Sequence, residues 1–161
     1  MADAASGERF RFLYRETEGA IDGATWARAS LLPVGLALVL SVIAFAIAPD
    51  KPRDLAAEAF ISPLIIIRQT YLIAYAFVLL ICLVAEYFLS AKRFRDLGKP
   101  AGLAGVAPFA LLIAGAANWY QPLSEGWMSY AELLAVDALA LAALAWFVAE
   151  LGFGRSRPKA N

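Results

Sequence analysis

The apolar residues of this chain fall into four long runs that are separated by short polar segments. The first run lies between Arg28 and Asp50 and contains no charge, and the third extends without a charge from Ala101 to Ser124. About 20 consecutive apolar residues are needed for a helix to cross the hydrocarbon core of a bilayer, so each run predicts a membrane span. We place the four spans at residues 29–48, 68–91, 102–119 and 130–151.

The segments outside the spans are too short for a separate folded domain. Residues 1–28 are predicted to form a cytoplasmic interfacial segment ahead of the four-span domain at 29–151, because the stretch from Phe10 to Trp26 alternates aromatic rings with arginines. A cytoplasmic ligand site is the alternative. Residues 61–67 are expected to lead into the second span, and Pro108 to bend or break the third. Residues 152–161 form a basic tail.

The positions of the lysines and arginines predict how the chain is oriented. With the N-terminus inside, eleven of the fourteen lysines and arginines fall on the cytoplasmic side, in residues 1–28, 92–99 and 152–161. The loop between the third and fourth spans contains none. Positive charge is retained in the cytoplasm, so the sequence predicts an all-α, antiparallel four-helix membrane bundle with both termini inside.

The composition agrees with this class and argues against several kinds of chemistry. Hydrophobic residues make up 61% of the 161 residues and charged residues 17%, against roughly 45–50% and about 25% in soluble domains. The formal net charge is zero, which predicts no nucleic-acid partner. Histidine is absent and Cys82 is the only cysteine, so we expect no metal, no cofactor and no enzymatic activity.

Three charged residues are predicted to lie at membrane depth: Arg68, Glu86 and Asp137. Ionisable groups in lipid usually face the bundle interior and have a partner. We therefore expect Asp137 to pair with Arg68, and Glu86 to pair with Arg93 or Arg28. These pairs either hold the bundle together or line a path for protons or ions.

A polar seam at helical spacing follows the second span: Arg68, Tyr71, Tyr75, Cys82 and Glu86. The fourth span carries an alanine stripe, whose members recur every three or four residues: Ala135, Ala138, Ala142, Ala145 and Ala149. Small residues at this spacing let helix backbones approach closely in lipid. The stripe is a helix-packing face that serves either the chain's own bundle or a dimer mate or larger partner.

The segment between the second and third spans is predicted to be a cytoplasmic basic loop, whose motif residues are Lys92, Arg93, Arg95, Asp96, Gly98 and Lys99. One interpretation is that these cations fix the topology of the chain close to anionic headgroups. The other is a docking or phosphate site.

Two pieces of the chain resemble motifs of a bacterial inner-membrane family, the domain of unknown function number 805. The family opens with "G-R-I-x-R-x-x-F/W", where this chain reads GAIDGATW at 19–26, and carries "R-R-L-H-D-x-G-x-S-G-W", where this chain reads KRFRDLGKPAGL at 92–103. Both arginines of the first motif are absent, and Arg95 replaces the histidine of the second. The resemblance implies a divergent four-helix member in a bacterial inner membrane. The family has no established biochemical role.

We therefore expect a multi-pass protein of the bacterial inner membrane. The preferred hypothesis is an accessory or structural subunit that packs against another membrane protein complex or forms a homo-oligomer within the lipid bilayer. The alternative is a small oligomeric transporter or channel that uses Arg68, Glu86 and Asp137. A third hypothesis, a membrane enzyme or lipid-binding protein, would use Glu86 and Asp137 as acid and base.

Overall fold

The chain forms helices and no strands over the residues that the computed structural model describes, which are 2–47, 63–121, 124 and 127–156. The elements are α1 (Ala2–Tyr14), α2 (Gly23–Ile47), α3 (Pro63–Asp96), the 3-10 helix η1 (Ala101–Gly105), α4 (Val106–Tyr120) and α5 (Tyr130–Phe153). In these ranges, α2, α3, η1 with α4, and α5 are long and apolar enough to cross a membrane. The predicted all-α, four-helix membrane fold is confirmed.

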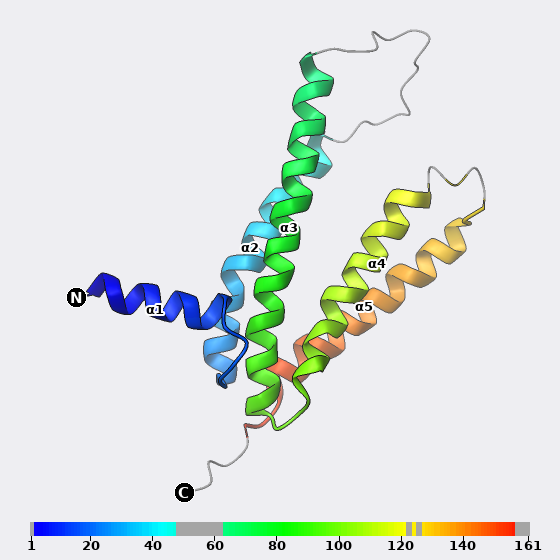
Figure 1. The fold of residues 1–161 in the computed structure, drawn as a ribbon. Coiled ribbons are helices and arrows are strands. Elements are labelled where there is room, and N and C mark those ends of the chain that lie inside the picture. Colours follow the sequence, from blue (N-terminus) through cyan, green and yellow to red (C-terminus); the bar gives the residue numbers. More distant parts are fainter. Residues whose placement is uncertain (1, 48–62, 122–123, 125–126, 157–161) are drawn as a thin grey trace, which may run out of the picture.

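The four spans form two helix pairs that meet at one end and diverge toward the other (Figure 1). α2 packs mainly against α3, and α4 packs mainly against α5. We call the end where the pairs meet the clamped end; it holds the C-termini of α3 and α5 and the N-terminus of α2. The opposite end, where α3 and α5 begin, is the open end. α1 extends away from the α2/α3 pair at a steep angle, and its C-terminal end meets the pair near the clamped end (Figure 1).

The hydrophobic core of the chain lies at the clamped end. Leu89, Phe94 and Leu151 have no exposed surface, and Trp26 and Phe147 are also buried. The Phe94 ring packs edge-on against the Phe147 ring, with 5.9 Å between the centroids. Elsewhere the spans expose large apolar side chains. Apolar surface of this kind is suited to contact with lipid, since acyl chains are as apolar as leucine.

α3 is longer at both ends than the predicted span 68–91. It begins at Pro63 because proline is favoured in the first turn of a helix, where its missing N–H has no helical partner. Of the predicted lead-in 61–67, residues 63–67 are therefore helical, while 61–62 lie outside the described residues. The helix also continues to Asp96, so the prediction of a loop that begins at Lys92 is wrong.

α2 starts earlier than the predicted residue 29, because Asp22 caps it. The Oδ1 atom of Asp22 accepts a hydrogen bond from the backbone N–H of Thr25 at 2.7 Å. This satisfies one of the N–H groups that a helix start leaves free. The interfacial segment predicted for 1–28 thus contains α1, the connection 15–22 and the first turns of α2.

The third span is divided into η1 and α4, and the fourth is a continuous helix. Pro108 is the third residue of α4, where a proline removes no helical hydrogen bond, so the irregular stretch precedes Pro108. α5 begins at the predicted Tyr130, after a capping box in which Ser129 and Glu132 bond reciprocally. Residues 48–62, which contain the polar segment between the first two predicted spans, and tail residues 157–161 lie outside the described residues.

Candidate functional site

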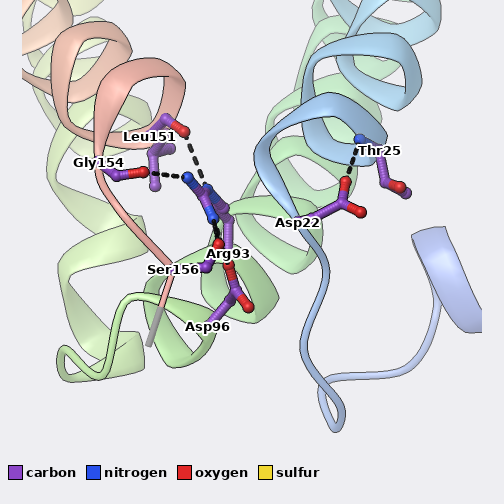
Figure 2. A network of polar contacts seen from close by, with 7 residues as sticks. All are labelled: Asp22, Thr25, Arg93, Asp96, Leu151, Gly154 and Ser156. Carbon is purple, nitrogen blue, oxygen red and sulfur yellow. Dashed lines mark hydrogen bonds and ion pairs between the residues drawn. The ribbon is translucent and has the colours of Figure 1, made fainter. Parts of the chain in front are cut away.

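Arg93, near the C-terminal end of α3, binds the C-terminal end of α5 (Figure 2). Its side chain is only 2% exposed. The guanidinium donates from Nε to the carbonyl oxygen of Leu151 at 2.9 Å and from Nη2 to that of Gly154 at 2.6 Å. The last carbonyl groups of a helix have no helical donor and carry partial negative charge, so a buried cation is stabilised there.

The same guanidinium also binds the residues that follow α5. Its Nη1 donates to the Ser156 hydroxyl at 2.9 Å and forms an ion pair with Asp96, which in turn accepts from Ser156. Figure 2 shows that Asp22, at the start of α2, lies close to this network. Arg93 contributes, after the hydrogen bonds from the Thr25 backbone and side chain, to lowering the pKa of the Asp22 carboxyl.

Lys92 performs the corresponding role for α1. Its side chain is fully buried, and its ammonium donates to the carbonyl oxygens of Leu13, at 3.2 Å, and of Glu16. The ammonium also lies 5.1 Å from the centroid of the Phe12 ring, within the range of a cation–π contact. Two adjacent cations therefore bind the C-terminal carbonyl groups of two different helices, α1 and α5.

The remaining residues of the basic segment are more exposed. Arg95 donates to the carbonyl oxygens of Thr17 and Gly19, and Lys99 pairs with Glu150 at 2.7 Å. Gly98 has a φ of 72°, which ends α3 in the left-handed region. Lys92 and Arg93 are buried and engaged, so these two cations form a structural clamp and are not open to a phosphate group, whereas Arg95 and Lys99 are exposed.

Tyr14 makes a further contact between α1 and α2. Its hydroxyl donates to the carbonyl oxygen of Ala29 at 2.8 Å. That carbonyl would accept from the residue four positions later, which is Pro33 and has no N–H. Tyr14 therefore supplies the missing donor. Burial, and to a smaller extent the charge of Glu86, raise the pKa of the Tyr14 hydroxyl.

The pair predicted between Arg68 and Asp137 is not formed, because they belong to the two helix pairs that diverge. Asp137 instead accepts a hydrogen bond at 2.8 Å from Nδ2 of Asn118, on α4. Among the ion pairs of the described residues, none includes Arg68. Sequence reasoning missed Asn118, because an amide within an apolar run does not by itself indicate a partner.

Glu86 does not pair with Arg93 or Arg28 either. Its Oε1 atom accepts hydrogen bonds from the hydroxyls of Ser30 at 3.0 Å and Ser90 at 3.2 Å. Trp26 donates from its indole nitrogen to the Ser90 hydroxyl at 3.1 Å. The second carboxyl oxygen, Oε2, is buried and has no hydrogen-bond partner among the described residues. We name these four residues the Glu86 cluster.

A cavity of about 470 Å³ adjoins the Glu86 cluster. Side chains of α2, α3, α4 and α5 line it, and they are apolar except for Ser41, Cys82 and three members of the cluster, Trp26, Ser30 and Glu86. This volume lies within the range of about 300–1,000 Å³ typical of small-molecule sites. The sequence missed this site because its walls come from four separate helices.

The outer part of the polar seam joins α3 to α2. The Tyr71 hydroxyl donates to the carbonyl oxygen of Leu40 at 2.8 Å, and the hydroxyls of Tyr75 and Ser41 lie 2.9 Å apart. Cys82 is buried and lines the cavity. Tyr71, Tyr75 and Glu86 of the seam thus face α2. The three intramembrane charges Arg68, Glu86 and Asp137 are not brought together.

The alanine stripe of α5 faces away from the rest of the chain. All five of its members are exposed: Ala135, Ala138, Ala142, Ala145 and Ala149. The buried residues of this helix are Ala140, Phe147 and Leu151, which lie on the opposite side at 3.6 residues per turn. The stripe therefore does not pack inside the chain's own bundle.

Comparison with known proteins adds no relative. No protein-family model, curated protein or solved structure matches the chain. Within the described residues, no group of three or more His, Cys, Asp or Glu side chains is placed to hold a metal ion. The candidate functional features of the described chain are therefore the clamp, the Glu86 cluster with its cavity, and the exposed stripe.

Proposed function

We propose that the chain is a non-catalytic accessory subunit that packs, through the alanine stripe of α5, against a helix of another membrane protein. The observation that carries this proposal is the exposure of the whole stripe on the face opposite Ala140, Phe147 and Leu151. Lipid provides no hydrophobic driving force between helices, so association depends on close packing, and small residues permit it.

The hydrogen-bonded residues Asn118 and Asp137, which join α4 to α5, also support this proposal. The hydrogen bond from Asn118 to Asp137 is exposed, although both residues lie on helices apolar enough to cross a membrane. Carboxyl and amide groups facing acyl chains are costly, and a neighbouring protein would shield them and offer further hydrogen bonds. A partner that covers this edge between α4 and α5 as well as the stripe would therefore make the subunit more stable in its complex than alone.

The hypothesis of a transporter or channel receives less support. Glu86 is bonded to Ser30 and Ser90 near the clamped end, whereas Asp137 is bonded to Asn118 on the other helix pair. A shared path through these charges would require them to converge. The inward orientation of both termini, the bacterial inner membrane and the resemblance to family 805 stay predictions from the sequence.

The proposal is tested by placing a bulky residue in the stripe. The Ala142→Trp variant should lose the membrane protein that co-purifies with the wild-type chain in mild detergent. Ala74→Trp is the matched control, because Ala74 is an exposed alanine of α3 in the other helix pair; this variant should retain the partner.

Two results would contradict the proposal. One is a wild-type chain that migrates as a lone monomer under every gentle condition, and the other is an unchanged partner in the Ala142→Trp preparation. If only a second copy of this chain is recovered, the partner of the stripe is the chain itself, in a homo-oligomer, and not another membrane protein.

A further inference from the structure

The cavity beside the Glu86 cluster is polar at one end and apolar along most of its length. Trp26, Ser30 and Glu86 form the polar end, toward the clamped end of the chain. Ser41, which also lines the cavity, is eleven residues beyond Ser30 on α2, or about 16 Å along the helix axis at 1.5 Å per residue. The cavity is therefore elongated along the spans.

The far polar residue offers no free group. The Ser41 hydroxyl donates to the carbonyl oxygen of Ala37 at 2.7 Å and also meets the Tyr75 hydroxyl. The polar end near the clamped end does have an unpaired atom, because Oε2 of Glu86 has no hydrogen-bond partner among the described residues. The neighbouring donors are directed elsewhere, at Oε1 of Glu86 and at the Ser90 hydroxyl. A buried acceptor without a donor is costly. Because the Glu86 side chain lines the cavity, a ligand there that supplies a donor would remove this cost once the carboxyl group turns toward it.

The charges of the residues that line the cavity restrict which headgroup a ligand can carry. Among the described residues that line the cavity there is no lysine or arginine, and Glu86 is the only carboxylic acid. A phosphate headgroup would bring negative charge close to this carboxyl with no cation to compensate. A headgroup that donates a hydrogen bond, whether neutral or positively charged, has the opposite effect.

We propose that this cavity binds a single-chain amphiphile whose headgroup donates a hydrogen bond, namely a long-chain alcohol or a long-chain amine. The headgroup donates to Glu86, and the hydrocarbon chain extends along Leu79 and Leu83 toward Ser41. This site is separate from the alanine stripe, which lies on the outer face of α5. The ligand proposal is therefore independent of the proposed packing against another protein.

The test uses three photoactivatable probes with the same diazirine-bearing C16 chain and different headgroups: a hydroxyl, a primary amine and a methyl ether. The purified full chain in phosphatidylcholine nanodiscs is labelled with each probe, and labelled peptides are quantified by mass spectrometry. A probe with a donor should label the segments around Leu83 and Leu111 about tenfold more than the methyl ether, which corresponds to one hydrogen bond to a buried carboxyl. The two donor probes show whether the alcohol or the amine is preferred.

Two variants separate the headgroup contact from the cavity itself. Glu86→Met removes the acceptor and keeps the length of the side chain, so the ratio of donor probe to methyl ether should fall to about one. Leu83→Trp fills the cavity and should lower labelling by all probes, whereas Ile81→Trp is its control, because Ile81 does not line this cavity. Size-exclusion profiles that match the wild type show that each variant is folded.

The proposal is overturned if the methyl ether labels the wild type as well as the donor probes do. It is also overturned if Leu83→Trp and Ile81→Trp are labelled to the same extent. Because neither variant alters the alanine stripe, co-purification of a protein partner through α5 should persist in both.

Discussion

The Tyr14 hydroxyl donates a hydrogen bond to the carbonyl oxygen of Ala29, which Pro33 leaves without a helical donor. The proline thus creates an acceptor inside α2, and α1 docks against that acceptor. A residue that interrupts the hydrogen bonds of one helix in this way determines where a second helix is attached.

This relationship predicts a double-mutant result. Tyr14→Phe should reduce the free energy of unfolding by about 1–3 kcal/mol, the cost of leaving a buried carbonyl without its donor. In a Pro33→Ala background the new backbone N–H can bond to Ala29, so Tyr14→Phe should cost much less. Unfolding in mixed detergent micelles, followed by tryptophan fluorescence, measures all four proteins. Equal costs in both backgrounds would show that the two residues are not coupled.

Arg93 is predicted to be the most important cation for stability. Arg93→Met removes the donors to Leu151 and Gly154 and leaves the Asp96 carboxylate without its ion-pair partner. The expected loss is about 3–5 kcal/mol, typical of breaking a buried charged pair. Arg95→Met is the control, because Arg95 is exposed and its loss should cost under about 1 kcal/mol in the same unfolding assay. Similar losses for both variants would refute the special role of Arg93.

Gly19 is predicted to tolerate no side chain. Its φ is 93°, and a Cβ atom would lie 2.7 Å from Cε2 of Phe12. Gly19→Ala should therefore destabilise the chain by at least about 1 kcal/mol, through the left-handed backbone alone. At Gly35, in the middle of α2, a Cβ meets nothing within 4 Å. Gly35→Ala should stabilise the helix by up to about 1 kcal/mol. The two alanine variants should therefore change the free energy of unfolding in opposite directions.

The Asp22 cap is predicted to make stability depend on pH. Hydrogen bonds from Thr25 hold the pKa of the Asp22 carboxyl below its usual range. The native state therefore favours the ionised form, so the contribution is present above the unfolded-state pKa, near 4, and is lost as pH falls through the folded-state value. The unfolding midpoint of the wild type should fall more between about pH 5 and 3 than that of Asp22→Asn, which keeps the cap without titrating there. Parallel pH profiles would contradict this assignment.

The four spans could be predicted from the sequence because crossing a membrane is decided locally. A run of about 20 apolar residues without charges satisfies its own backbone hydrogen bonds as a helix and buries its side chains in lipid, whatever its neighbours are. The start of α5 at Tyr130 was predicted for this reason. The end of α3 at Asp96 was not predicted, because the charged residues after Ala91 indicate a segment that faces water, whereas Lys92 and Arg93 are buried within the helix.

The site depends on contacts between residues that are far apart in the chain. Lys92 and Leu13 are 79 positions apart, and Arg93 and Leu151 are 58 apart. Pattern and spacing identified Glu86 as an acid at membrane depth, but its partners Ser30 and Ser90 follow from how α2 lies against α3.

The sequence by itself determined that this chain is a helical, four-span membrane protein, and it located the charges and small residues that lipid makes notable. Only the tertiary structure decided that Lys92 and Arg93 bind helix C-termini, that Glu86 has an unpaired oxygen beside a cavity, and that the alanine stripe faces outward. The physical reason is that hydrophobic periodicity fixes which face of a helix is apolar or small. Which neighbour that face meets is set by the packing of all the helices together.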